Sequence, residues 1–239
     1  MKLAIVGYGK MGKLIEQLAA QFGFEVALKL DSRNNAGGAG ITREDFRGIA
    51  AAVEFSTPAA APENLRRLSA LGIPTVAGTT GWHAQLDALR AAVELNGAAL
   101  VWAPNFSVGV NAFLNIVAEA ARRLAEDADY GAWAWDIHHA AKKDAPSGTL
   151  LTLVDEMKRA GYARPVSVGS ARAGAHPGTH EIGFDSAADT ITLRHTARSR
   201  EGYARGALKA ARWVIGKKGF FAFRDIVTEL GKVPAASRP

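Results

Sequence analysis

Apolar and polar positions along the first hundred residues follow two alternating rhythms. Short apolar runs of strand length alternate with segments whose apolar residues recur every three or four positions, which is the spacing of one helix face. Glycines such as Gly23 and Gly72 end the helical segments. We predict strands at residues 2–7, 24–30, 51–56, 73–77 and 98–103, with helices between them that include 62–71 and 83–95. Strands that alternate with helices predict an α/β fold with a Rossmann-type, doubly wound parallel sheet.

The rhythm changes after residue 105. We expect a long helix at 108–124 and strands at 130–137, 166–171, 179–184 and 190–196. The last strand alternates apolar and polar residues, which is typical of a sheet with one exposed face. These elements predict a second, α+β domain with a mixed or antiparallel open sheet over residues 105–215, closed by a helix at 203–215. The apolar stretch 219–225 should pack back on the first domain, which would then contain 1–104 and 216–239.

The charge balance points to small anionic ligands. The 239 residues include 29 Lys and Arg against 23 Asp and Glu, a formal net charge of +6. The basic residues are dispersed and show no zinc-finger spacing or basic helix, so we expect no nucleic-acid partner. No apolar run reaches transmembrane length, so we expect no membrane contact. The lack of cysteine and a strand that begins at residue 2 favour a cytoplasmic protein without a signal peptide.

A glycine-rich turn lies between the first predicted strand and the first predicted helix. Gly7, Gly9 and Gly12 form a G-x-G-x-x-G pattern, whose glycines permit a tight turn, close approach of a pyrophosphate and close helix packing. Asp31 stands where a carboxylate binds the adenosine ribose, whereas Arg33 could pair with a 2′-phosphate. The sequence therefore predicts a nicotinamide dinucleotide site and leaves NADH or NADPH open. We expect both to be used.

Further cofactor contacts are expected where strands end at the carboxyl edge of the sheet. The loops at 55–58 and 78–81 can offer amides and hydroxyls to a nicotinamide carboxamide, although each could equally be a generic turn. The full set of expected cofactor residues is Gly7, Tyr8, Gly9, Lys10, Met11, Gly12, Asp31, Arg33, Ser56, Thr57, Gly78, Thr79, Thr80, Ala103, Asn105 and Phe106.

Residues 138–149 form the densest polar run in the chain. They bring two imidazoles, two ammonium groups, a carboxylate and two hydroxyls together immediately before a segment with helical spacing. A helix N-terminus binds anions through its free N–H groups, and histidine or lysine can donate a proton. This combination suits an anionic substrate that must accept a proton.

The polar run resembles the signature of the 4-hydroxy-tetrahydrodipicolinate reductase (dihydrodipicolinate reductase) family. The matching string is His138-His139-x-x-Lys142-x-Asp144-x-Pro146-Ser147-Gly148-Thr149, and the resemblance extends through segments 54–58, 78–81, 103–111, 178–182, 195–200 and 206–213. It implies an NAD(P)H-dependent oxidoreductase of lysine and diaminopimelate biosynthesis that reduces a cyclic pyridine-2,6-dicarboxylate-type substrate to tetrahydrodipicolinate, with loss of water. It also implies a homotetramer built through the sheets of the second domain.

The resemblance implies a role for each polar residue of the run. His138 would be the general acid with help from Lys142, and the substrate carboxylate would be bound by His139, Lys142, Ser147, Gly148 and Thr149. The family often carries Glu two residues before the first histidine, and Asp136 stands there with a shorter reach, which leaves its role open. We expect no metal site, because two histidines without a third ligand do not make a zinc centre.

The neighbouring polar residues are assigned smaller roles. We expect Lys143 to be solvated and Asp144 to orient the loop before Pro146. His180 and His195, on predicted strands of the second domain, are interpreted as structural or interfacial. Two other function classes stay open from the residues: an amino-acid dehydrogenase acting on aspartate or meso-diaminopimelate, and a nucleotide sensor without turnover.

Overall fold

The chain forms two compact units in the computed structural model, which describes residues 1–232. One unit contains Met1–Val108 and the segment from Glu201 onward, and the other is Gly109–Arg200. The last residues that the sequence interpretation assigned to the first domain, 233–239, lie outside the described part of the chain.

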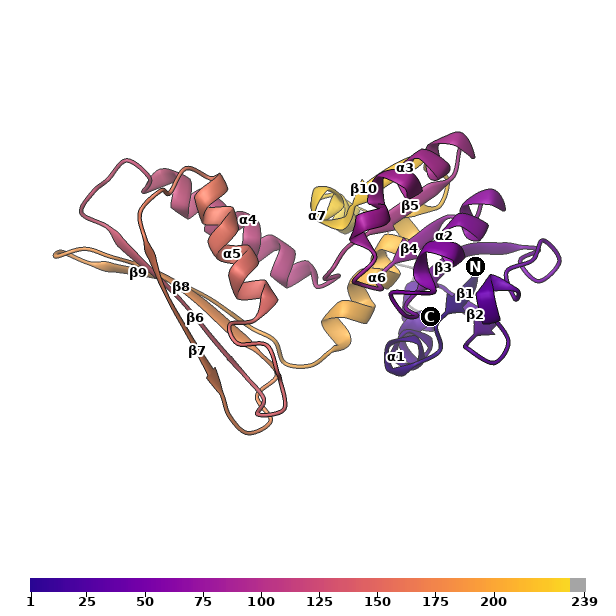
Figure 1. The fold of residues 1–239 in the computed structure, drawn as a ribbon, viewed down its shortest axis with the longest axis horizontal. Coiled ribbons are helices and arrows are strands. Elements are labelled where there is room, and N and C mark those ends of the chain that lie inside the picture. Colours follow the sequence, from indigo (N-terminus) through magenta and orange to yellow (C-terminus); the bar gives the residue numbers. More distant parts are fainter. Residues whose placement is uncertain (233–239) are drawn as a thin grey trace. The chain divides into compact units, whose positions relative to one another are not determined.

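The first unit contains a six-stranded sheet in the order β10-β5-β4-β3-β1-β2 (Figure 1). Every pairing in it is parallel, as the alternation of strands and helices predicts. The strands are β1 (Lys2–Val6), β2 (Glu25–Leu30), β3 (Ile49–Glu54), β4 (Thr75–Ala77), β5 (Ala99–Trp102) and β10 (Gly219–Ala222). The pairing of β10 with β5 confirms that the apolar tail packs back on this unit.

The helices of the first unit pack on this sheet through small and apolar side chains. They are α1 (Lys10–Ala19), α2 (Ala61–Ala70), α3 (Leu86–Leu95), α6 (Glu201–Val214) and the short α7 (Phe223–Ile226), with 3-10 turns at Ala20–Phe22, Ala36–Gly38, His83–Gln85 and Leu230–Lys232. The sequence interpretation placed α6 in the second domain, but it packs in the first unit. The reason is close backbone contact, since a Cβ at Gly206 would lie 1.7 Å from the Phe106 carbonyl oxygen.

The second unit is a four-stranded mixed sheet whose one face is covered by two helices (Figure 1). The strand order is β7-β6-β8-β9, with β6 parallel to β7 and antiparallel to β8, and β8 antiparallel to β9. The elements are α4 (Val108–Arg123), β6 (Gly131–His138), α5 (Gly148–Arg159), β7 (Val166–Arg172), β8 (Thr179–Asp185) and β9 (Thr190–Thr196). The predicted fold class is confirmed. None of the described helices is long and apolar enough to cross a membrane.

Side chains on β6 alternate between the two faces of this sheet. Ala132 and Ala134 point toward the helices and pack in a core that includes Ile182 of β8. Asp136 and His138 continue the same buried row with polar groups, because residues two apart on a strand share a face. The apolar core therefore ends at two buried polar side chains, Asp136 and His138, where β6 leads into the polar run.

Glu54 is the last residue of β3, and its side chain is fully buried. Its Oε1 accepts hydrogen bonds from the Ser56 hydroxyl, from the Ser56 amide at 3.1 Å and from the Asn64 side-chain amide at 3.4 Å. No ion pair to Glu54 is formed within residues 1–232. Burial raises the pKa of Glu54, which favours a neutral carboxyl group supported by its neighbours.

We expect Glu54→Gln to be at least as stable as the native chain at pH 8. Because the pKa of Glu54 is higher in the folded than in the unfolded chain, the native state binds more protons, and its free energy of unfolding falls as the pH rises through the folded pKa. The amide cannot ionise and escapes this loss. Urea unfolding at pH 5 and pH 8 should show the difference shifting toward the variant as the pH rises.

Glu54→Ala provides the control for this comparison. It leaves the Ser56 and Asn64 donors without their acceptor and should cost about 1–3 kcal/mol at both pH values. A Gln variant that lost stability relative to the native chain as the pH rose would contradict a neutral Glu54.

Candidate functional site

The glycine turn after β1 has the geometry that its sequence predicts. Gly7 has a φ of 101°, and a Cβ there would lie 2.2 Å from the Phe55 carbonyl oxygen. A Cβ at Gly12 would lie 2.5 Å from the Gly7 carbonyl oxygen, so α1 can approach the turn only without a side chain there. Gly9 has no heavy atom within 4 Å of its Cβ position. Its backbone is therefore open to a ligand at the N-terminus of α1, as pyrophosphate binding requires.

Asp31 and Arg33 form an ion pair just beyond the end of β2. Arg33 Nη2 lies 2.7 Å from Asp31 Oδ2, and the Arg33 amide donates to Asp31 Oδ1 at 2.9 Å. The Arg33 guanidinium lowers the pKa of Asp31, which is therefore charged. The Arg33 side chain is 88% exposed, so it can also turn to a ligand. Together with the open turn at Gly9, this pair fits a dinucleotide that carries either a ribose hydroxyl or a 2′-phosphate here.

The remaining expected cofactor residues differ in exposure. Lys10, Thr57 and Thr80 are exposed, Tyr8, Met11, Ser56, Gly78 and Asn105 are half-buried, and Thr79, Ala103 and Phe106 are buried. The Phe106 ring packs against Phe223, with 4.7 Å between the ring centroids. The Phe106 side chain therefore supports its loop from the core, and a direct contact with a cofactor falls to its backbone.

Ser147 fixes the junction between the polar run and α5. It is the N-cap of α5, and its hydroxyl oxygen accepts the Leu150 amide at 3.2 Å. The Ser147 amide donates to Asp136 Oδ2 at 2.8 Å, and Ser147 Oγ lies 3.1 Å from His180 Nε2. Ser147 is only 2% exposed. Its hydroxyl therefore holds the turn from inside, whereas the resemblance implied a contact with the substrate.

Gly148 and Thr149 form the first turn of α5, where amides have no carbonyl one turn earlier to bind. The Asp144 carboxylate lies at this helix end. Its two oxygens bind Lys142 Nζ at 2.7 and 2.8 Å, and Oδ2 lies 3.4 Å from the Gly148 amide. The Lys142 ammonium group lowers the pKa of Asp144. The loop thus binds a carboxylate of its own chain between a lysine and a helix N-terminus.

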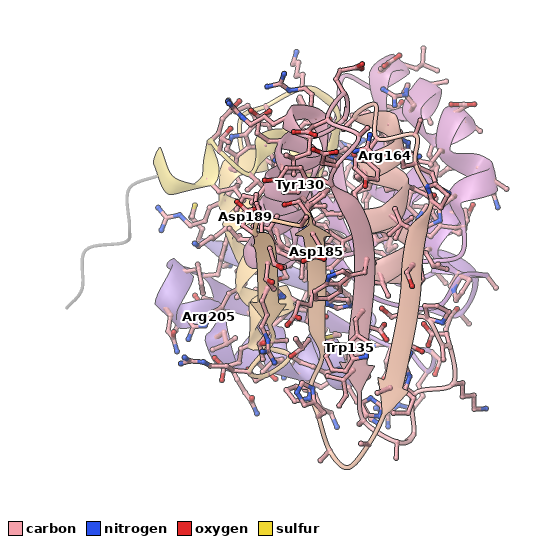
Figure 2. The ribbon with its side chains drawn as sticks, turned by 90° about the vertical axis from the view of Figure 1, so that its left-hand side faces the viewer. Tyr130, Trp135, Arg164, Asp185, Asp189 and Arg205 are labelled. Carbon is pink, nitrogen blue, oxygen red and sulfur yellow. The ribbon has the colours of Figure 1, made fainter. Side chains whose placement is uncertain are left out.

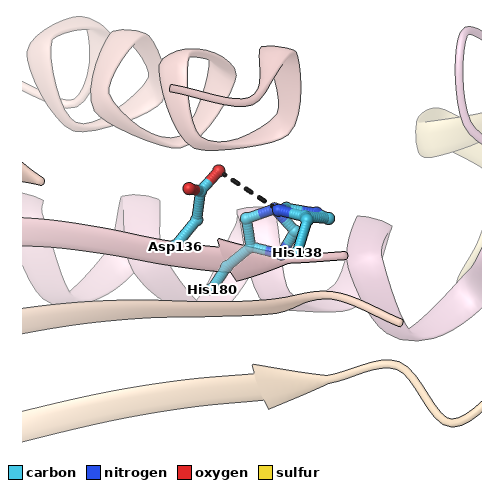
Figure 3. A group of neighbouring side chains, drawn as sticks. All are labelled: Asp136, His138 and His180. Atoms are coloured by element: carbon cyan, nitrogen blue, oxygen red, sulfur yellow. Dashed lines mark ion pairs between the residues drawn. The ribbon is translucent and has the colours of Figure 1, made fainter. Parts of the chain in front are cut away.

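Asp136, His138 and His180 form a buried cluster at the end of the sheet (Figure 3). Each residue offers one atom that could ligate a metal ion, and these three atoms lie within 4.8 Å of one another. Asp136 Oδ2 is 3.5 Å from His138 Nδ1. The two imidazoles meet edge to face with their centroids 5.1 Å apart. Burial lowers the pKa of His138, and burial lowers the pKa of His180 to about 4. Both rings are therefore neutral at pH 7 when no ligand is bound.

Asp136 is charged although it is fully buried. Burial acts against its ionisation, but hydrogen bonds from Ser147 and Arg172 outweigh it and lower the pKa of Asp136. Arg172 Nη1 lies 2.9 Å from Asp136 Oδ1, and Arg172 Nη2 donates to the Asp144 carbonyl. Asp136 joins His138 and His180 as a third possible metal ligand, whereas the sequence analysis left the role of Asp136 open and expected no third ligand. Because both of its oxygens already accept N–H bonds and the guanidinium balances its charge, the cluster suits hydrogen bonding and proton transfer better than a divalent cation.

Arg172 and His180 are the members of the site that sequence reasoning missed. Arg172 faces His138 in the register of β6 and β7, and His180 faces Asp136 in the register of β6 and β8. His180 belongs to segment 178–182, which the resemblance included, so a signal for it was present. Two further expectations agree with the structure, since Lys143 is exposed and Asp144 binds within the loop.

Known proteins resemble this chain along most of its length. Models of the N- and C-terminal parts of dihydrodipicolinate reductase match residues 1–106 and 109–227. A protein of Christiangramia forsetii named 4-hydroxy-tetrahydrodipicolinate reductase is 33% identical over 245 residues, which cover 97% of this chain and 100% of the relative. A protein of Thermosipho africanus with the same name is 34% identical over 235 residues, with 96% and 99% covered.

Solved structures agree with the fold. A dipicolinate-bound dihydrodipicolinate reductase from Paenisporosarcina sp. TG-14 has a TM-score of 0.81 at 19% identity and covers 95% of this chain and 99% of its own. An amine dehydrogenase from Mycobacterium smegmatis shares the architecture less closely, with a TM-score of 0.64 at 11% identity and 94% and 95% covered. The two matching models and the relatives above 30% identity show that the chain belongs to the dihydrodipicolinate reductase family.

Proposed function

We propose that the protein reduces 4-hydroxy-tetrahydrodipicolinate to tetrahydrodipicolinate, in lysine and diaminopimelate biosynthesis, with NADH or NADPH as reductant. The reaction takes up one hydride and one proton and releases one water molecule. The reduced nicotinamide of a dinucleotide held by its pyrophosphate at the Gly9 turn would supply the hydride. The observation that carries the proposal is a loop directly after His138 in which Lys142 and the Gly148 amide bind a carboxylate, in a chain of this family.

A substrate carboxylate fits the position that the Asp144 carboxylate occupies. Lys142 would exchange one carboxylate for another and keep its ion pair. The Gly148 and Thr149 amides add donors at a helix N-terminus, where negative charge is favoured. His139 is exposed in the same loop and is proposed as a further contact.

His138 is the proton donor in this proposal. Burial lowers its pKa, but a substrate with two carboxylates brings negative charge that favours the imidazolium, and Asp136 is already 3.5 Å from Nδ1. A proton on His138 can then neutralise the charge that hydride addition leaves on the substrate. Lys142 assists by its charge.

His138→Ala and Lys142→Ala should each lower kcat by about 10²–10⁴-fold, the range for general acid–base groups. Initial rates at saturating cofactor measure the effect. Lys143→Ala is the matched control, because this lysine is exposed in the same loop, and its kcat should stay unchanged. Native turnover in both of the first two variants would remove the assignment.

We expect the enzyme to use both NADH and NADPH. The test supplies the product of the upstream aldolase and follows the absorbance of each reduced cofactor separately. Arg33→Ala should raise KM for NADPH by about tenfold or more, since it removes a charged donor to the 2′-phosphate, and leave KM for NADH nearly unchanged. Asp31→Ala should act mainly on NADH.

Strict selectivity of the native enzyme for one cofactor would contradict dual use. Oxidation of neither cofactor would contradict the proposed reaction itself. Ammonia-dependent oxidation would instead indicate an amino-acid dehydrogenase.

We further propose a homotetramer assembled through the open face of the second sheet. This face carries Trp133 and Trp135, which alternate along β6 with the helix-facing Ala132 and Ala134. Figure 2 shows Trp135 on this face, which no helix of the second unit covers. Trp133 lies over Gly183, where a Cβ would be 2.0 Å from its ring, and Trp135 lies next to Gly169. The two indole rings therefore give this face apolar area beside the Glu181–Arg194 ion pair, and a second copy of the sheet can cover the rings.

Trp135→Glu should shift the native tetramer to a smaller species, because a charge buried at the interface would lack a partner. Size-exclusion chromatography with light scattering gives the mass of the assembly, and circular dichroism checks the fold. Leu95→Glu is the control, since Leu95 on α3 is 87% exposed in the other unit. A tetramer that survives Trp135→Glu would argue for another interface.

A further inference from the structure

His180 and Ser147 form a buried pair behind the carboxylate-binding turn. They are 6% and 2% exposed, and His180 Nε2 lies 3.1 Å from Ser147 Oγ. Ser147 Oγ already accepts the Leu150 amide. We assign the Ser147 hydroxyl as the donor and Nε2 as the acceptor, which places the proton of the neutral ring on Nδ1, a buried atom with no hydrogen-bond partner among the described residues. The opposite tautomer would instead leave the buried Ser147 hydroxyl proton without an acceptor.

We propose that His180 is a positioning residue for the dicarboxylate: as a neutral acceptor at Nε2 it orients Ser147, and Ser147 in turn fixes the Gly148 and Thr149 amides that bind the carboxylate. This role rests on the proposed function. Ser147 is held from three directions, by His180, by Leu150 and by Asp136. Loss of the His180 bond frees the side chain that sets the direction of the first helical turn.

The surroundings of His180 keep its ring neutral. Burial disfavours a positive charge on the ring most strongly, and the charged forms of His138, His195 and Lys142 would oppose it as well. Asp136 favours that charge, but it is already bound to Ser147 and Arg172. Burial lowers the pKa of His180 to about 4, so the ring stays neutral in the physiological range.

His180 also contacts the proposed proton donor. Its ring meets that of His138 edge to face, and a Cβ at Gly178 would lie 2.9 Å from His138 Nε2. The His138 ring is thus confined between Gly178 and His180. Substitution of His180 can separate its ring contact with His138 from its hydrogen bond with Ser147. Phe keeps the ring contact and removes the hydrogen bond, whereas Gln offers a hydrogen-bond acceptor at similar reach.

The test measures the affinity for pyridine-2,6-dicarboxylate (dipicolinate) by calorimetry, together with KM and kcat. His180→Phe and Ser147→Ala should each raise the Kd of dipicolinate and the substrate KM by about tenfold, the effect of one buried hydrogen bond, with a smaller fall in kcat. The Kd of NADPH should not change. His180→Gln should recover most of the affinity, and the double variant Ser147→Ala/His180→Phe should bind no more weakly than either single variant.

Additive losses in the double variant, or native affinity in His180→Phe, would overturn the role of His180. If His180→Phe does not fold, His180→Asn takes its place, because its shorter amide does not reach Ser147 and should show the same loss. A native chain that neither binds dipicolinate nor oxidises NAD(P)H with substrate would overturn the proposed function and this role together. Native binding by both the wild type and His180→Phe would overturn the role alone.

Discussion

The second unit is organised around the charge of Asp136. Its carboxylate is fully buried, and a buried charge without partners costs several kcal/mol. Both oxygens therefore have N–H donors, Ser147 on one side and Arg172 on the other. These two bonds connect β6 to the first turn of α5 and to β7. Because Arg172 also donates to the Asp144 carbonyl, the loop of the polar run is fixed at its centre as well as at its end.

Local patterns in the sequence predicted most of the fold. The strands of both sheets and the helices packed on them were predicted from the spacing of apolar residues. The glycine turn was predicted from three glycines whose roles depend only on nearby backbone. The position of α6 did not follow, because its amphipathic pattern shows that one face is buried but not against which sheet. The small residues along that face, among them Gly206, permit the close contact that places α6 in the first unit.

The candidate site was predictable only in its contiguous part. His138, Lys142, Gly148 and Thr149 lie in one run, so their proximity is guaranteed by the chain. Arg172 and His180 reach the same place only through strand register, and a shift of one residue would turn either side chain to the opposite face. Asp136 was visible in the sequence, but its shorter reach became meaningful only once Ser147 and Arg172 were seen to meet it.

Two fully buried carboxyl groups show how the donors around a group decide its charge. Glu54 is surrounded by hydroxyl and amide groups and has no guanidinium, so burial prevails and raises its pKa. Asp136 has a guanidinium at 2.9 Å as well as a backbone amide, and the same burial is outweighed. A charged Asp136 is what the proposed reaction needs, since it stabilises a proton on His138 when the substrate binds. The same reasoning explains the neutral state of His180, which receives no direct bond from Asp136 and can therefore accept from Ser147.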